Sequence, residues 1–458
     1  MKVAILGGGV CGLYAARRLA AAGVDVTVIE KEPIFGGLAV SQARGNNFYD
    51  LGVHMLHEHD REIFEDLKAI MGDESIEVQL DARIRWAGGF YRYPLQFGDM
   101  IKGMPPLLLA RCVVSLFAAQ LRNKIAPWEP SNCEEALQQL YGNELYRFFF
   151  EEFTHRYWGI HPRDISAMFV KRKMPRLSAV DAIKKALSLI GIKEGRGRTV
   201  ESALLDETLH YARTGAEALP RLLAAQIERD GGQLIAGASV EEVKLQHGAV
   251  TGVTYSPSGG GEPVEVECDH CINTIPVPLL IGKISPGPPP GVRRAAENLS
   301  FLPIVIYGLL VKRERVLDGL YVYYRDRIFH RVGEPKNAGL AVDPPDHTVL
   351  IVEMTCQKGD GKWLAEPSVK EQVYADLEAE SICDREDIVE MHVLRNEFGY
   401  PVFGIEYEPH HEKVLKYLAG IPTIRSTGRQ GGFCFPNMHG AMRMGADAAD
   451  ALLGEGVS

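Results

Sequence analysis

Three histidines crowd into one short stretch, LGVHMLHEHD, at residues 51–60. Imidazole side chains can ligate a metal, relay a proton or hydrogen bond to a neighbouring group. His54, His57 and His59 therefore leave three interpretations open: a metal site, a proton relay, or a loop that lies against another group. Elements elsewhere in the chain must position them, and the clearest of these elements begins at the N-terminus.

The first thirty residues carry the strongest chemical signal. An apolar strand over residues 3–6 is followed by G-x-G-x-x-G, an alanine-rich helix over 13–22 and a second strand over 24–29. Glu30 ends that strand, about 18 residues after the last glycine of the pattern. A glycine pattern between a strand and a helix, followed at this distance by an acid, is typical of a Rossmann dinucleotide-binding unit.

Each glycine of this pattern has its own expected role. Gly7 permits a tight turn, Gly9 lets the backbone approach a pyrophosphate, and Gly12 allows the helix to pack closely on the strand. The free N–H groups at the helix N-terminus attract phosphate. We therefore predict dinucleotide contacts from Gly7, Gly9, Val10, Cys11, Gly12, Glu30 and Lys31.

Composition limits the class of protein. The 458 residues, 46% of them hydrophobic, predict two or three globular domains. A net charge of −10 argues against a nucleic-acid partner. The eight cysteines are scattered, and the one C-x-x-C, Cys268 to Cys271, lies in an apolar run that predicts a single buried strand. We expect reduced thiols, no metal and a cytoplasmic protein without a signal peptide.

The longest apolar run, PPLLLARCVVSLFAAQL at residues 105–121, predicts a helix. It is short for a membrane span and contains Arg111. A packed helix is the favoured interpretation. A helix that lies on a membrane surface, giving peripheral contact through 105–121, remains the main alternative.

Several segments resemble FAD proteins of the amine oxidase and protoporphyrinogen oxidase superfamily. KEPIFGGLA, after Glu30, is similar to the E-x-x-x-x-x-G-G extension of that superfamily, and residues 231–255 resemble its second strand pair. GRQGGFCFPNMHG, from residue 428, resembles its closing flavin motif. The resemblance implies FAD as the cofactor, with further contacts from Gly36, Gly37, Leu38, Val240, Gly428, Arg429, Asn437 and Met438.

A narrower resemblance is to the UDP-galactopyranose mutases. GVHMLHE is similar to their G-P-H-I-F-H-T loop, which implies that His54 and His57 lie beside the flavin instead of at a metal. Residues 132–177 resemble their helical domain. This implies that Trp158 flanks the substrate and that Arg172, with Arg176 nearby, binds a diphosphate. A core tryptophan and a surface basic patch are the plain alternatives.

Two positions depart from the mutase pattern. Phe435 replaces a tyrosine whose hydroxyl touches phosphate, and Leu302 with Pro303 stands where the mutases have an arginine. Other segments, including residues 319–337 and 398–409, resemble the protoporphyrinogen-oxidase-like relatives. Arg331 and Glu353 are then candidate pocket residues, with exposed charges on a sheet as the alternative.

The predicted fold class is α/β: a Rossmann-type, GR2-like FAD-binding domain with a helical insertion and an antiparallel-sheet substrate domain. We assign residues 1–90, 205–295 and 400–458 to the FAD-binding domain, 91–204 to the insertion and 296–399 to the sheet. The predicted function is FAD-dependent oxidation of a small substrate by hydride transfer to flavin N5, with His54, Trp158 and Arg172 as catalytic residues. The alternative is a mutase-like isomerase that uses reduced FAD on a nucleotide sugar; a flavin-bound structural or membrane-associated protein is a third class.

Overall fold

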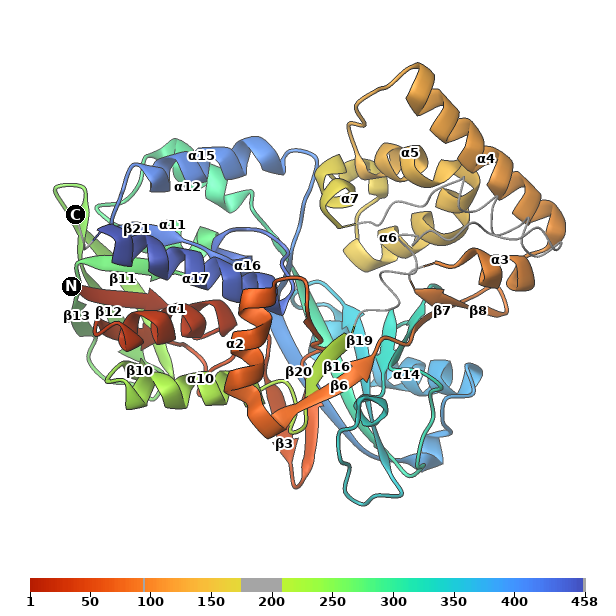
Figure 1. Ribbon diagram of the computed structural model, residues 1–458, viewed down its shortest axis with the longest axis horizontal. Helices are drawn as coiled ribbons and strands as arrows, with labels where there is room; N and C mark the ends of the chain where they lie inside the picture. The colour runs from red at the N-terminus through yellow and green to blue at the C-terminus, as the bar shows by residue number, and fades with distance from the viewer. Residues whose placement is uncertain (94, 174–207, 456–458) are drawn as a thin grey trace.

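A computed structural model describes residues 1–93, 95–173 and 208–455. Its parts form three regions around a common centre: a layered α/β region, a helical layer and a large sheet (Figure 1). Segments far apart in sequence build the α/β region and the large sheet, whereas the described helical layer comes from one stretch of chain, residues 97–173.

A parallel sheet is the framework of the first region. Its strands run in the order β10 (Gln233–Ile235), β2 (Asp25–Ile29), β1 (Lys2–Leu6), β14 (His270–Asn273) and β21 (Ile424–Ser426). Four of the five residues of β1 and of β2 are buried, as expected for parallel strands covered on both faces. This is the predicted Rossmann unit, and its first helix begins slightly earlier than expected, at Val10.

Helices cover one face of this sheet and a second sheet covers the other. One hydrophobic core joins β1 and β2 to the helices α1 (Val10–Ala21), α2 (Arg61–Met71), α10 (Ala218–Arg229) and α17 (Met438–Glu455). The opposite core contains the strands β11 (Ala238–Gln246), β12 (Ala249–Pro257) and β15 (Ile284–Ser285), and the helices α11 (Val277–Lys283), α12 (Pro290–Glu297) and α15 (Tyr407–Ala419).

The C-x-x-C region differs from the prediction. Instead of one buried strand, the structure has β13 (Val264–Glu267), which pairs with β12, and then β14 in the parallel sheet. Cys268 and Cys271 are both buried and free. The chain changes sheet between the two cysteines, and an apolar run alone does not encode such a crossing.

The large sheet has seven strands in the order β20 (Ile388–Pro401), β16 (Phe301–Val311), β19 (Thr348–Thr355), β18 (Arg331–Gly333), β17 (Tyr321–Tyr324), β7 (Ala82–Trp86) and β8 (Gly89–Tyr93). Every neighbouring pair is antiparallel except β17 with β7. Residues 82–93 therefore join this sheet, although the predicted limits assigned 82–90 to the FAD-binding domain. On its outer side lie α13 (Gly361–Leu364) and α14 (Pro367–Ala379).

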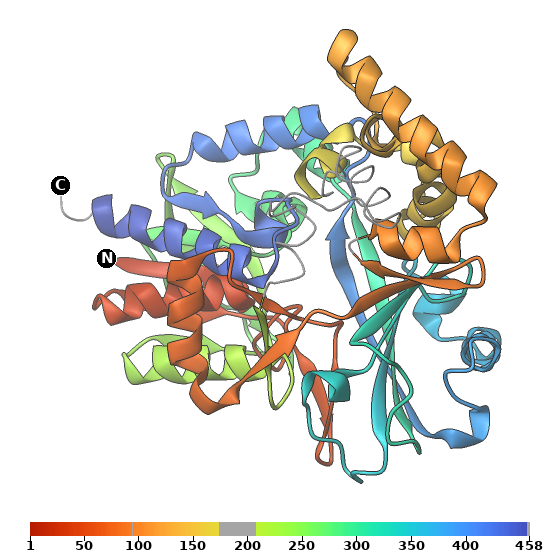
Figure 2. The same ribbon diagram turned by 45° about the vertical axis from the view of Figure 1, so that its right-hand side comes forward.

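The helical layer faces the large sheet (Figure 2). It contains α3 (Phe97–Gly103), α4 (Pro106–Ile125), α5 (Cys133–Leu145), a π-helical turn (Tyr146–Phe150), α6 (Glu151–Trp158) and α7 (Ala167–Lys173). Small pairings complete the fold: β3 (Ser41–Arg44) with β4 (Asn47–Asp50), and β5 (Leu56–His57) and β6 (Ser75–Gln79) with β9 (Thr208–Ala212). In the described parts of the chain, no helix combines the length and apolarity needed to cross a membrane.

Candidate active site

A cavity of about 940 Å³ lies where the three regions meet. One end is formed by the glycine loop before α1 and by the end of β2. The opposite end lies between the helical layer and the large sheet, and is lined by residues of α6, β7 and β17.

Gly9 and Gly12 have different surroundings in the glycine loop, in line with the different roles predicted for them. A Cβ atom on Gly12 would lie 2.2 Å from the carbonyl oxygen of Gly7, so only glycine lets α1 pack here. A Cβ atom on Gly9 would meet no protein atom closer than 3.8 Å, and the φ angle of Gly9 is an ordinary −72°. Gly9 is therefore not required for packing within the chain, and its open side faces the cavity.

Glu30 is buried at the end of β2 and lines the same part of the cavity. Its carboxylate accepts hydrogen bonds from the backbone N–H groups of Gly8, at 2.7 Å, and Glu32, at 2.9 Å. Burial raises the pKa of Glu30 above its usual value, although the two hydrogen bonds act to lower it. Each oxygen keeps a lone pair that a ribose hydroxyl could use.

Most of the residues predicted to contact the cofactor line this cavity. They are Gly7, Gly9, Val10, Cys11, Glu30, Lys31, Gly36, Gly37, Leu38, His54, Val240, Arg429, Asn437 and Met438. Gly12 and Gly428 lie behind the lining: a Cβ atom on Gly428 would be 2.9 Å from Sγ of Cys11. Their individual contacts with a cofactor stay a prediction.

Arg429 supplies a feature that fits a bound flavin dinucleotide. Its Nε and Nη2 atoms are buried and have no hydrogen-bond partner. The guanidinium lies between two rings, 4.1 Å from the ring centre of Phe435 and 4.9 Å from that of Tyr400. Buried donors without acceptors are rare in folded proteins. An acceptor on FAD would satisfy them, and the open side of Gly9 leaves room for its pyrophosphate.

The histidine loop lies beside Arg429. Nε2 of His54 is 3.1 Å from the backbone oxygen of Leu51. Burial lowers the pKa of His54 to about 4, and the nearby charges of Arg429 and Arg331 act in the same direction. His54 is therefore neutral at pH 7 and donates from Nε2, which leaves Nδ1 as an acceptor.

His57 and His59 lie at the edge of the cavity. Their rings stack with centres 5.4 Å apart, and the ring of His439 from α17 lies within 5.7 Å of both. Across the described residues, no three histidine, cysteine or acidic side chains are arranged to hold a metal ion.

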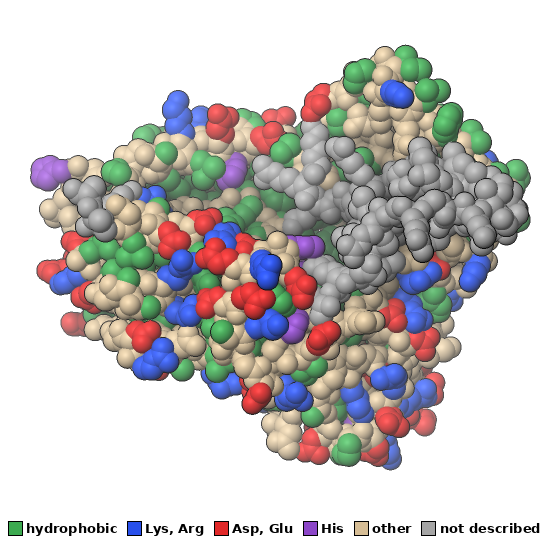
Figure 3. Space-filling model, in the orientation of Figure 1, with side chains coloured by type: hydrophobic (Ala, Val, Ile, Leu, Met, Phe, Trp, Pro, Cys, Tyr) green, Lys and Arg blue, Asp and Glu red, His purple; other side chains and the backbone are tan. Residues whose placement is uncertain are grey.

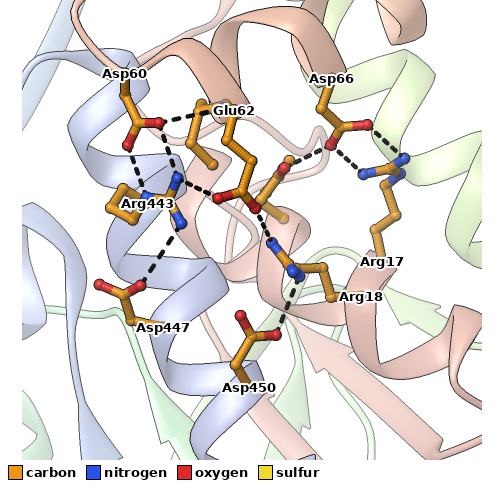
Figure 4. Close-up of polar contacts among 10 residues, drawn as sticks. Arg17, Arg18, Asp60, Glu62, Asp66, Arg443, Asp447 and Asp450 are labelled. Atoms are coloured by element: carbon orange, nitrogen blue, oxygen red, sulfur yellow. Dashed lines mark hydrogen bonds and ion pairs between the residues drawn. The ribbon is translucent and has the colours of Figure 1, made fainter.

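A network of ion pairs holds this loop on the first region (Figure 4). Asp60 caps α2 by accepting a hydrogen bond from the N–H of Ile63. Its carboxylate also accepts two hydrogen bonds from Arg443 of α17, at 2.6 and 2.8 Å. Arg443 reaches Glu62 as well, at 2.9 Å. We call the Asp60–Arg443 pair the clasp, because it joins the end of the histidine loop to α17.

Glu353 is the centre of a buried polar group on the large sheet. Oε1 accepts from the hydroxyl of Tyr400 at 3.0 Å and lies 2.9 Å from Nε2 of His330. Oε2 accepts from Nε of Arg331 at 3.0 Å. Burial opposes ionisation, but Arg331 and His330 outweigh it and hold the pKa of Glu353 well below its usual range. Arg331 and Glu353 thus line the cavity and are not exposed charges.

Aromatic rings form most of the remaining wall at this end. They are Trp86, Tyr93, Phe149, Phe150, Phe153, Tyr157, Trp158, Tyr321 and Tyr323. Trp158 is buried and lines the cavity, with its ring centre 5.5 Å from that of Tyr157. Arg172 belongs to α7, but the position of its side chain lies outside the described part of the structure, as does Arg176 altogether.

Among the cavity residues that were not assigned from the sequence, three have polar groups near the proposed substrate space. Tyr157 and Tyr400 hydrogen bond to each other and lead to Glu353, and Arg325 lines the cavity beside Trp86. They lie in residues 132–177, 398–409 and 319–337, whose family resemblances gave none of the three a role. Their roles depend on contacts between elements distant in sequence, which spacing along the chain does not reveal.

The fold and the cavity together define a Rossmann-type flavoprotein with a separate substrate sheet. The chain belongs to the flavin-containing amine oxidoreductase family, whose family model matches residues 10–453. FAD is its cofactor, and the predicted fold class is confirmed.

Known relatives include enzymes of more than one type. A dTDP-fucopyranose mutase of Escherichia coli is 25% identical over 183 residues, which are 39% of this chain and 48% of that protein, so the matched part spans about half of the relative. The structure of a reduced UDP-galactopyranose mutase is similar over all of this chain and 94% of the other, with a TM-score of 0.82 and 21% identity.

Two oxidases have the same fold. A candidate protoporphyrinogen oxidase from Exiguobacterium sp. 255-15 has a TM-score of 0.71 and 16% identity, over 98% of both chains. Putrescine oxidase has a TM-score of 0.64 and 18% identity, over 99% of both chains. The predicted resemblance to both branches, the oxidases and the mutases, is confirmed.

Proposed function

We propose that this FAD-dependent oxidoreductase oxidises a small, largely apolar molecule held between the helical layer and the seven-stranded sheet. The supporting observation is the wall at that end of the cavity. Aromatic side chains dominate it, and the charges of Glu353 and Arg331 are already paired with each other. Such a wall favours an apolar body over a nucleotide diphosphate, which needs several donors.

In this proposal bound FAD supplies the hydride acceptor, and the chain positions and shields the substrate. Trp158 and Tyr157 line the substrate space, and Tyr157 adjoins the Glu353 group through its hydrogen bond with Tyr400. Neutral His54 offers Nδ1 as an acceptor near Arg429. Glu353 holds the side chains of Arg331 and Tyr400 in place, because its carboxylate accepts a hydrogen bond from each.

A sugar-nucleotide mutase is the second candidate. It is supported by the similarity to reduced UDP-galactopyranose mutase over the whole chain and by His54 and Trp158 in one cavity. Phe435 and Leu302 count against it. The ring of Phe435 lies under Arg429 and brings no hydroxyl, while Leu302 is a buried apolar side chain.

One anaerobic experiment separates the two candidates. The purified protein with oxidised FAD is screened for small molecules that bleach its flavin absorbance. The same protein, chemically reduced, is then given UDP-galactopyranose or dTDP-fucopyranose and analysed by chromatography for the furanose isomer. Bleaching by an apolar compound without isomer formation supports the oxidoreductase. Isomer formed only by the reduced protein overturns it.

We also propose that α4 contacts an anionic membrane surface. Five large apolar residues on this helix are at least 45% exposed: Leu107, Val114, Phe117, Leu121 and Ile125. Residues 101–128 contain two lysines and two arginines but no acid, although the whole chain is acidic. Figure 3 shows hydrophobic side chains gathered along the outer upper-right edge, where α4 lies. Cations beside an exposed apolar stripe suit anionic lipid headgroups.

Sedimentation with vesicles tests this contact. We expect the protein to bind phosphatidylglycerol-containing vesicles more than pure phosphatidylcholine, and less at high salt. The variant Phe117→Ser/Leu121→Ser/Ile125→Ser should lose this binding, whereas Leu364→Ser, at an equally exposed position elsewhere, should keep it. Equal sedimentation of both variants, or self-association instead of vesicle binding, would refute the proposal. A cytoplasmic location is also proposed; it is supported by the eight cysteines, none of which is in a disulfide in the described structure.

A further inference from the structure

We propose that Arg325 anchors an anionic group, a carboxylate or a phosphate, on a substrate whose remaining body lies against aromatic rings. This inference rests on the proposed substrate space and adds the chemistry of its ligand. Arg325 directly follows β17 and lines the cavity at the junction of the large sheet with the helical layer.

Two contacts hold the Arg325 guanidinium without neutralising its charge. Its central carbon lies 3.8 Å from the ring centre of Trp86, a close cation–π contact. Nη1 donates a hydrogen bond to the backbone oxygen of Phe148 in the π-helical turn. Because Trp86 and Phe148 belong to different regions, the guanidinium is fixed between them.

Among the described residues, the arginines that line the cavity, Arg325, Arg331 and Arg429, differ in what they can offer a ligand. Arg331 is bound by Glu353, and Arg429 lies between two rings at the end of the cavity assigned to the flavin. Arg325 forms no ion pair with any carboxylate of the described residues, and its buried Nε has no acceptor. A planar guanidinium with unused donors fits the oxygens of a carboxylate or phosphate.

Nearby acidic side chains weaken the attraction of Arg325 for an anion but do not abolish it. Glu151, Glu152 and Asp326 act on it from a distance, while burial lowers the pKa of the guanidinium. Arginine nevertheless stays charged in proteins. No described carboxylate of the wall forms an ion pair with this cation, so an anionic group of a ligand could do so. The substrate class that fits best therefore has an apolar or aromatic body with one anionic end.

Calorimetric titration of the oxidised, FAD-loaded protein tests the inference without turnover. The ligands are 3-phenylpropanoate, its neutral amide 3-phenylpropanamide, and phenyl phosphate. We expect both anions to bind at least ~10-fold more tightly than the amide, because bonds to a charged group are the stronger ones. The relative affinity of the two anions distinguishes a carboxylate from a phosphate.

Three variants complete the design. Arg325→Met should weaken anion binding by ~10- to 100-fold and leave amide binding unchanged, and Arg325→Lys should lose less. Arg83→Met removes a charge from β7 outside the cavity and should change neither. The FAD content of each variant verifies folding, since Arg325 also supports the π-helical turn. If Arg325→Met does not retain FAD, the anion and amide affinities of Arg325→Lys are compared with those of the unchanged protein instead.

The inference is overturned if the anions and the amide bind the unchanged protein equally, if no anion binds it, or if loss of the Arg325 charge leaves anion affinity intact. These outcomes are independent of the oxidation screen. A protein that binds anions through Arg325 but oxidises nothing would refute the proposed reaction and retain the anchor.

Discussion

Gly9 and Gly12 lie three residues apart but respond to different demands. Replacing Gly9 by Val adds atoms toward the cavity, where no protein atom is near, so we expect a folded protein that has lost most of its FAD. Replacing Gly12 by Ala drives Cβ into the Gly7 carbonyl and should cost about 1–3 kcal/mol of unfolding free energy.

The ratio of flavin to protein absorbance and the thermal midpoint of the FAD-free forms measure the two effects separately. Full FAD occupancy in Gly9→Val would contradict the role given to the glycine loop. A melting temperature lowered as much by Gly9→Val as by Gly12→Ala would show that Gly9 serves packing instead.

Glu353 should give the substrate wall a distinct dependence on pH. Its folded pKa is held below the unfolded value, so its stabilising contribution is present above pH ~4.3 and declines as the pH falls through the folded pKa. Glu353→Gln leaves Arg331 without its carboxylate and should cost about 3–5 kcal/mol at pH 7.

Urea unfolding at pH 7 and pH 4 measures this difference. The gap between the unchanged protein and Glu353→Gln should narrow at pH 4, and Arg331→Met/Glu353→Gln should be more stable than Glu353→Gln alone. A gap that stays constant between pH 7 and pH 4 would mean that the pKa of Glu353 is the same in the folded and the unfolded protein.

At the scale of elements, local patterns were predicted well and pairings between distant segments were not. The expected strand over residues 3–6 is β1, and the expected helix over 13–22 is α1, because apolar runs and glycines act within a few residues. The parallel pairing of β7 with β17 has no local signature.

The candidate site divides in the same way. Gly9, Glu30 and Arg429 belong to sequence motifs, and all three line the cavity. Arg325 follows β17 and Trp86 ends β7, two strands that meet only in the folded sheet, and Tyr157 of α6 meets Tyr400 of β20 between the helical layer and the sheet. A single sequence does not contain the register that brings such pairs together.

Mutation of the clasp tests whether the contact between the start of α2 and α17 stabilises the fold. Arg443 holds the pKa of Asp60 at about 2, so the pair is ionised from pH 3 upward. Because both side chains are partly exposed, we expect a coupling energy of about 1 kcal/mol from a double-mutant cycle of Asp60→Asn and Arg443→Met. The exposed pair Arg385–Glu371 is the control and should show less coupling. Equal coupling energies in the two cycles would mean that the clasp stabilises the protein no more than an exposed ion pair does.

At the scale of the whole molecule, the cavity gathers segments from both ends of the chain. Gly9, Glu30, Val240 and Arg429 lie far apart in sequence yet line one space. A ligand that binds them together binds only the folded state, and such a ligand stabilises folding by RT ln(1 + [L]/Kd). FAD should therefore act as a link between the N-terminal and C-terminal parts of the fold.

We predict that FAD-free protein melts at a lower temperature than the loaded form, and that added FAD raises the midpoint with the logarithm of its concentration. At a free concentration 100 times Kd the gain should be about 2.7 kcal/mol. ADP, which can occupy only the end near Glu30, should give a smaller gain, because it leaves the buried donors of Arg429 without acceptors. The Gly9→Val protein should respond to neither ligand. Equal stabilisation by FAD and ADP would place all of the linkage at the nucleotide end, and would remove Arg429 from the residues that hold the flavin.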